Sequence, residues 1–195
     1  MRGLTQRLED ARSYRGAWLR PSNFESFWEP SVAFAQNAQV ESVAELPSAT
    51  QTATFKRITF ASTDQTQLSA RVILPAGASA AELSDTTELP AVVLFSDLGR
   101  GVRSWLHLLR FSALGLPVVA LEARPCETRL KDAWRGALTA EELAHALINP
   151  DDAASSTLKQ LIDDALVATS VASRFLERTT VTWGEGLGGS QALFA

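Results

Sequence analysis

The chain has 195 residues, 46% of them hydrophobic, which is enough to bury one substantial core in a single domain. Its 18 basic and 22 acidic residues give a net charge of −4 with no run of one sign, which argues against nucleic acid or an anionic membrane as a partner. Cys126 is the only cysteine, so the sequence excludes an intrachain disulfide and a thiolate metal site.

The amino-terminal residues carry no recognisable targeting signal. Charged residues follow Met1 in place of an apolar segment, which argues against a signal peptide. No apolar run approaches the roughly 20 residues that a transmembrane helix needs. We therefore expect a soluble, cytoplasmic protein, and nothing in the composition calls for a cofactor.

Two helices are expected near the amino terminus. The first is short and polar and covers residues 5–14, and the second begins after Ser22, with Glu25 completing a capping box. Three aromatic residues of the second helix share one face and could anchor it to the rest of the chain: Phe24, Phe27 and Trp28. The polar, alanine-rich residues 40–52 are expected to form a loop.

Alternating polarity then predicts an antiparallel hairpin from residues 54–62 and 67–74. The apolar side chains of its second strand lie on one face: Leu68, Ala70, Val72 and Leu74. Residues 91–95 and 117–121 are continuous apolar runs, typical of parallel strands buried on both faces. A helix expected over 102–114 joins them into a βαβ unit.

The end of the chain has the pattern of a nucleophile elbow. A long amphipathic helix over 158–177 leads to a β-branched and aromatic strand, 180–183, then to the glycine-rich residues 184–189 and the start of a helix. A strand, a sharp turn and a helix are the setting of the nucleophile in α/β-hydrolases. In that fold the five expected strands are arranged 1-2-4-3-5, which places 180–183 at the edge of the sheet.

These patterns predict a truncated α/β-hydrolase fold. An antiparallel amino-terminal hairpin precedes parallel strands, with helices on both faces of the sheet. Residues 1–52 would form a helical arm, and residues 53–195 would form a partial α/β-hydrolase domain that ends just after the elbow.

The chain resembles the acetyl xylan esterase and cephalosporin-C deacetylase family. The matching motifs follow the family order: Tyr14-Arg15-Gly16, Arg20-Pro21, Phe27-Trp28, Arg71 with Leu74-Pro75, the strand 90–95 and Leu147 to Asp152. The resemblance covers nearly all of residues 8–195 but only the amino-terminal three-fifths of a family member. It implies acyl transfer to serine, with acetylated sugars or small esters as substrates, and a ring-shaped hexamer in intact relatives.

The positions that carry catalysis in this family differ in this chain. The family's His-Gly-Tyr is replaced by Ser96-Asp97-Leu98, and its Asp-x-Arg-Gly-Gln-Gly by residues 122–127, Glu-Ala-Arg-Pro-Cys-Glu. At the elbow, the family's Gly-Gly-Ser-Gln-Gly-Gly corresponds to residues 184–189, Gly-Glu-Gly-Leu-Gly-Gly, so Gly186 stands at the nucleophile position. Glycine has no hydroxyl group, so no acyl-enzyme can form there.

A second register would make Ser190 the nucleophile. Residues 188–191 reproduce the family's Gly-Gly-Ser-Gln, although a poor strand would then precede the serine. We favour the first register, because it also aligns Ala192-Leu193 with the family's Leu-Ala-Leu helix. In that register the backbone N–H groups of Leu98 and Leu187 take the oxyanion positions, which do not depend on side-chain identity.

The acid and base of α/β-hydrolases follow the nucleophile in the sequence, and nine residues follow Gly186 here. His107 and His145 both precede it, on expected helices, and a surface or half-buried position is the simpler interpretation of each. Three carboxylates could serve as acids but have no base to pair with: Asp97, Asp163 and Asp164.

The tryptophans carry little functional signal. Trp105 and Trp183 are expected in the core, which leaves Trp18 and Trp134 as the ones that could stack on a sugar. Cys126 is expected to be inert, as an isolated loop cysteine usually is.

Two classes of function remain open at this stage. One is a catalytically inactive member of the deacetylase lineage. The other is a non-enzymatic pseudo-esterase that binds or assembles as a homo- or hetero-oligomer with related esterases, or a decayed gene fragment. Two structural features are also expected: an unusual backbone conformation at Gly186, and an unprotected edge at strand 180–183 through which the chain could associate.

Overall fold

The computed structural model describes residues 4–14, 20–47, 50–76, 89–98, 100–102, 104–122, 124, 139–149 and 151–195. Its helices are α1 (Leu4–Ser13), α2 (Phe24–Asn37), α4 (Trp105–Ser112), α6 (Ala140–Leu147), α7 (Thr157–Leu176) and α8 (Leu187–Phe194), with a 3₁₀ turn η3 (Ala153–Ser155). Its strands are β1 (Ser42–Leu46), β2 (Ala53–Ala61), β3 (Gln67–Pro75), β4 (Ala91–Phe95), β5 (Val118–Leu121) and β6 (Thr180–Gly184).

The six strands form one sheet in the order β1-β2-β3-β5-β4-β6. Strands β1, β2, β3 and β5 pair antiparallel in succession, whereas β4 pairs in parallel with β5 on one side and with β6 on the other. The predicted order of the five expected strands is confirmed, and so is the edge position of β6.

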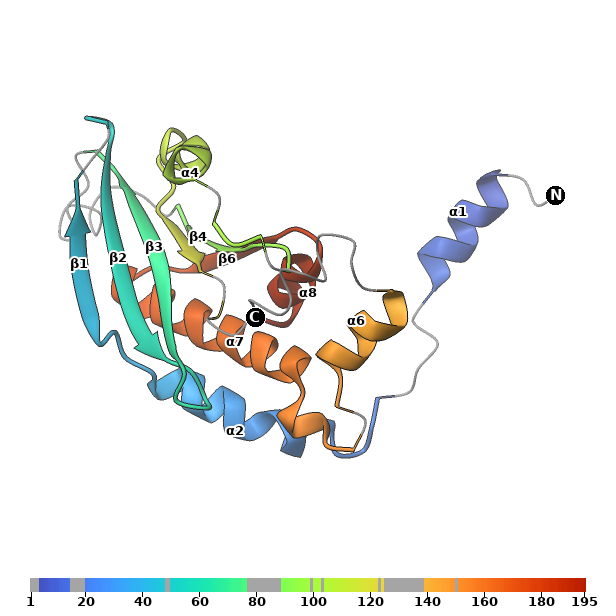
Figure 1. Ribbon diagram of the computed structural model, residues 1–195. Helices are drawn as coiled ribbons and strands as arrows, with labels where there is room; N and C mark the ends of the chain where they lie inside the picture. Colours follow the sequence, from blue (N-terminus) through green and yellow to red (C-terminus); the bar gives the residue numbers. More distant parts are fainter. Residues whose placement is uncertain are drawn as a thin grey trace.

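The two faces of the sheet carry separate cores, which explains the continuous apolar runs of the parallel strands. In β4, Ala91, Val93 and Phe95 join the core on the α7 side, and Val92 and Leu94 join the core on the α4 side. In Figure 1, α2 and α7 lie on one side of the sheet and α4 on the other. The predicted α/β architecture, with helices on both faces, is therefore confirmed.

The expected loop over residues 40–52 is wrong for part of its length. Ser42–Leu46 form β1, which pairs with β2 from Ser42 opposite Thr59 to Leu46 opposite Phe55. Four of its five residues are exposed and only Leu46 packs against the core, so pairing with β2 contributes more than burial to holding this strand. The sequence therefore contains no apolar alternation that could have revealed β1.

Helix α2 docks on α7 through polar as well as aromatic contacts. The Arg174 guanidinium on α7 donates to the carbonyls of Ala35 at 3.0 Å and of Gln36 at 2.8 Å, and also to that of Ala38. A cation at the carboxyl end of a helix satisfies its last carbonyl groups and complements its dipole. One arginine thus fixes the end of α2 against the domain.

The expected capping box at the start of α2 is wrong. The helix begins at Phe24 after Asn23, whose side chain makes no capping hydrogen bond. Glu25 pairs instead with Arg20, at 2.7 Å. The aromatic face does anchor the helix, since Trp28 stacks on Phe194 of α8 with ring centroids 6.3 Å apart.

Among the helices that the structure describes, none has the length and apolar content required to cross a bilayer.

Candidate functional site

The candidate site lies at the carboxyl ends of β4 and β6. From β4 the chain crosses one face of the sheet through α4 to reach β5, and from β5 it returns through α7 on the other face to β6. Loops that leave adjacent parallel strands toward opposite faces open a crevice at the strand ends, where ligands of α/β proteins bind. Two hollows lie there, and they share Phe95, Ser96, Asp97 and Gly101.

Gly186 forms the sharp turn between β6 and α8. Its backbone has φ 57° and ψ −125°, a conformation open to glycine and strained by about 1–3 kcal/mol for other residues. The unusual conformation expected for this residue is therefore confirmed. A Cβ added here would lie 2.0 Å from Oδ1 of Asp97, so both the backbone and the space select glycine.

Helix α8 starts almost in contact with the end of β4. A Cβ on Gly188 would meet the carbonyl oxygen of Phe95 at 2.4 Å, so only a glycine permits this approach. Farther along, the Gln191 amide donates to the Leu161 carbonyl at 2.7 Å, and the Thr182 hydroxyl donates to the Ala192 carbonyl at 2.6 Å. These bonds tie α8 to α7 and β6 and fix the geometry of the turn.

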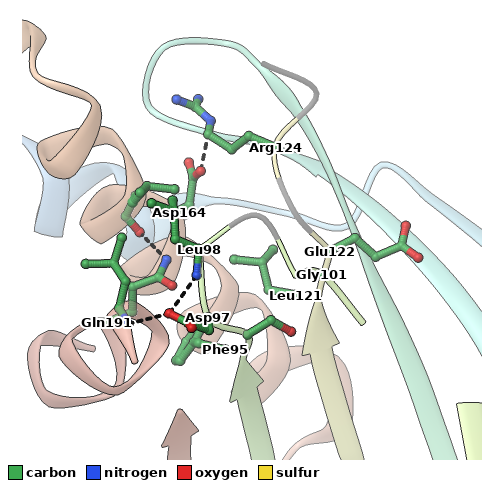
Figure 2. A pocket seen from close by; sticks show the side chains of 12 residues that line it. Phe95, Asp97, Leu98, Gly101, Leu121, Glu122, Arg124, Asp164 and Gln191 are labelled. Atoms are coloured by element: carbon green, nitrogen blue, oxygen red, sulfur yellow. Dashed lines mark hydrogen bonds and ion pairs between the residues drawn. The ribbon is translucent and has the colours of Figure 1, made fainter. Parts of the chain in front are cut away.

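Two backbone N–H groups converge on one oxygen at this turn. Leu98 and Leu187 donate to Oδ1 of Asp97 at 2.9 and 3.0 Å. Figure 2 shows the contact with Leu98. Arg100 lies farther away, with Nε 4.0 Å from the other carboxylate oxygen, and the Asp97 side chain is 26% exposed. The two amides that the sequence assigned to an oxyanion hole therefore meet, and the chain's own carboxylate lies between them.

Ser190, the alternative nucleophile, lies within α8, four residues past the turn. It is half-buried, and its helical backbone differs from the strained turn at Gly186. The structure thus places the two candidate positions on different elements, with only Gly186 beside Asp97.

The two histidines lie apart from the amide pair. His107 is exposed on α4, where it lines the rim of one hollow. His145 is exposed on α6, with Nε2 4.0 Å from Glu141. Within the described part of the chain, neither histidine is hydrogen-bonded to Asp97, Asp163 or Asp164, and the surface interpretation of both histidines is confirmed.

The sequence did not reveal the role of Arg124, which is almost fully buried beside the site. Its guanidinium donates to both carboxylate oxygens of Asp64 at 2.7 Å and to Gln160 at 2.8 Å, and its Nε lies 2.9 Å from Asp164. Ser62 donates to the other oxygen of Asp164. These contacts join the β2–β3 turn to α7, as Figure 2 shows for Arg124 and Asp164.

The surroundings shift the pKa values of two carboxyl groups in this cluster in opposite directions. Burial raises the pKa of the Asp164 carboxyl to about 7, against the opposing effects of Arg124 and Ser62. Burial also acts to raise the pKa of Asp64, but hydrogen bonds from Arg124 and Thr66 hold it below its usual value. Asp164 is the group whose charge conflicts most with its surroundings.

The remaining predicted acid, Asp163, and the neighbouring Glu122 are both held by structural contacts. Asp163 accepts hydrogen bonds from Lys159 at 2.7 Å and Thr63 at 2.9 Å. Glu122 accepts from Ser69 at 2.5 Å and from Arg71 at 2.7 Å, and these bonds hold its pKa below the usual value although burial opposes them. Buried carboxylates paired in this way serve the fold and are poorly placed to exchange protons.

No group of three side chains suited to holding a metal ion occurs among the described residues. Trp105 is half-buried and packs against the core on the α4 side, as expected. Trp183, expected in the core, is 48% exposed at the edge of the sheet, where none of the described strands lies beyond β6. Trp18, Trp134 and Cys126 lie outside the described residues.

The sheet order, the crossovers and the strained strand–turn–helix at Gly186 define an α/β-hydrolase fold. The acetyl xylan esterase (AXE1) family model matches residues 1–195, and the chain belongs to this family. No curated protein matches the chain.

Solved structures show the same fold at low sequence identity. An acetyl xylan esterase from Paenibacillus sp. R4 is 18% identical over 100% of this chain and 60% of its own, with a TM-score of 0.70. Acetyl xylan esterase 1 from Thermoanaerobacterium sp. JW/SL YS485 is 19% identical over 96% of this chain and 58% of its own, with a TM-score of 0.68. The chain therefore spans about 60% of the length of these structures.

Proposed function

We propose that this chain is a non-catalytic member of the acetyl xylan esterase family, derived from enzymes that transfer an acyl group from acetylated sugars or small esters to serine. In this proposal Gly186 stands where the nucleophile belongs, and the N–H groups of Leu98 and Leu187 stand where the oxyanion is bound. The observation that carries it is the position of Asp97, whose Oδ1 accepts both N–H groups and lies 2.0 Å from a Cβ built on Gly186.

Each of the two requirements for acyl transfer is unmet at this turn. A nucleophilic step needs a hydroxyl or thiol at the apex, and glycine offers neither. The tetrahedral intermediate needs free N–H donors for its negative oxygen, and here the Asp97 carboxylate already accepts them. A substrate carbonyl would also meet the negative charge of Asp97, which repels a developing oxyanion.

An esterase assay tests the proposal directly. The purified chain should not hydrolyse p-nitrophenyl acetate or acetylated sugars above a buffer control. Gly186→Ser alone should remain inactive, because serine without a base is a weak nucleophile and its Cβ has no room beside Asp97. A burst of acetyl release that disappears in Ser190→Ala would overturn the proposal and assign the nucleophile to Ser190.

A role as an assembly subunit is the second candidate, and the free edge of β6 favours it. Val181 and Trp183 on this strand are 46% and 48% exposed, and Leu193 and Phe194 on α8 are 89% and 50% exposed. An edge strand that is paired on one side only and carries exposed apolar side chains is a template for pairing with another chain. The partner in this candidate function is a second copy or a related esterase.

A further inference from the structure

We propose that Asp97 is a built-in ligand of the Leu98–Leu187 amide pair, and that this pair takes a small external carboxylate such as acetate when the Asp97 side chain leaves. The inference rests on the proposed function, because a working oxyanion hole would be filled by substrate and not by the protein. It assigns small carboxylates as the ligands of this site, and it makes the Asp97 side chain the group that controls access to the amides.

The amide pair is a shaped acceptor site and not a single helix end. Leu98 follows β4 and Leu187 begins α8, so the donors come from two segments 90 residues apart in the chain. They converge on one oxygen at 2.9 and 3.0 Å, the spacing of a charge-assisted hydrogen bond. In this structure they bind a carboxylate, so the external ligand that we propose is also a carboxylate.

Asp97 also separates the two hollows at the strand ends. One hollow extends toward α7 and includes Arg124 and Asp164, and the other extends toward α4 and includes Arg110 and Trp183. Asp97 lines both, and Figure 2 shows its carboxylate directed toward Leu98 and α8 from the loop after β4. Rotation of this side chain away from the amides would join the hollows into one crevice.

Among the described residues, Asp97 supplies all three atoms nearest to the Cβ position of Gly186. Gly186 has no side chain, and the atom nearest to its missing Cβ is Oδ1 of Asp97. Removal of the carboxylate therefore leaves two aligned N–H groups beside an open position at the turn. An external carboxylate that accepts both N–H groups would restore the hydrogen bonds lost with the Asp97 side chain.

In the unaltered chain, Asp97 competes with any free carboxylate. A side chain attached next to its binding site has an effective concentration in the millimolar range or above. Acetate at millimolar concentration should therefore fail to displace it, and the same acetate should occupy the amides once the tethered carboxylate is removed.

The test is an acetate titration followed by ¹H–¹⁵N NMR of the full chain. In Asp97→Ala, the amide resonances of Leu98 and Leu187 should shift in a saturable way, with an affinity at least about tenfold above that of the unaltered chain. Acetamide, the neutral analogue of acetate, should produce a much smaller shift. Asp97→Asn keeps the size of the side chain without its charge, and its affinity for acetate should lie between that of Asp97→Ala and that of the unaltered chain.

Glu185→Ala is the matched control, because it removes an exposed carboxylate from the same crevice without vacating the amides. It should behave as the unaltered chain does, and an equal gain of acetate binding in this variant would overturn the assignment to Asp97. The inference is also overturned if folded Asp97→Ala and Asp97→Asn both fail to bind acetate. Hydrolysis by the unaltered chain would instead refute the proposed function, so the two failures are distinct.

Discussion

Gly186→Ser tests the geometry of the turn more sharply than any other substitution. Two costs follow from the structure. A non-glycine residue at φ 57° and ψ −125° carries about 1–3 kcal/mol of backbone strain. Its Cβ would also displace Asp97, which accepts two N–H hydrogen bonds whose loss, reduced by solvent because the side chain is 26% exposed, costs about 1–2 kcal/mol in total.

The expected destabilisation is therefore about 2–5 kcal/mol, and its second part should depend on Asp97. In Asp97→Ala the two hydrogen bonds are already absent and the clash with Gly186→Ser no longer arises. The double variant should then be more stable than the sum of the single effects predicts, with a coupling free energy of about 1–2 kcal/mol.

Urea denaturation followed by circular dichroism measures these differences, and thermal melting provides a second reading at about 2–4 °C per kcal/mol. Gly189→Ser is the matched control, since a Cβ at that position has its nearest neighbour at 3.4 Å and the residue lies within α8. It should change the free energy of unfolding by less than about 1 kcal/mol. Unchanged stability in Gly186→Ser, or strict additivity with Asp97→Ala, would refute this account of the turn.

Two further predictions concern the buried charges and the sheet edge. The pKa of Asp164 is about 7 in the folded chain, against 3.8 for an unperturbed aspartate, so between these values the folded state keeps a proton that the unfolded state loses. Stability should therefore fall by up to about 4 kcal/mol as pH rises from about 4 to 7. Urea titrations across this range should show a flatter profile for Asp164→Asn than for the exposed control Asp151→Asn. At the edge, the chain should elute as a concentration-dependent oligomer, and Val181→Lys should shift it toward monomer because a charge opposes strand pairing. A concentration-independent monomer in the unaltered chain would contradict the edge prediction.

The architecture could be predicted because its determinants are local. Continuous apolar runs identified β4 and β5 as doubly covered strands, and helical periodicity identified α7. The order of these strands then followed from the family fold. In contrast, β1 leaves four of five residues exposed, so its side chains give no periodic signal.

The site could be predicted only in part. The glycine-rich turn marked Gly186 as an unusual backbone position, and register alone assigned Leu98 and Leu187. The contact between Asp97 and the amide of Leu187 joins residues 90 positions apart, so no local pattern encodes it. The burial of Arg124 was missed for the same reason, because its partner Asp64 is 60 positions away in the β2–β3 turn.

Gly186 and Asp97 depend on each other at this turn. A side chain at 186 would occupy the position of Oδ1 of Asp97, so the carboxylate can reach the amides only where the apex residue is glycine. Conversely, a glycine apex without Asp97 would leave two aligned N–H groups without an acceptor from the chain, at a cost of about 1–2 kcal/mol in total. Glycine at position 186 therefore avoids the clash with Asp97, and Asp97 accepts the N–H groups that a glycine apex would otherwise leave without an acceptor. The turn can in this way keep the strained backbone of a nucleophile elbow while its two N–H donors are satisfied within the fold.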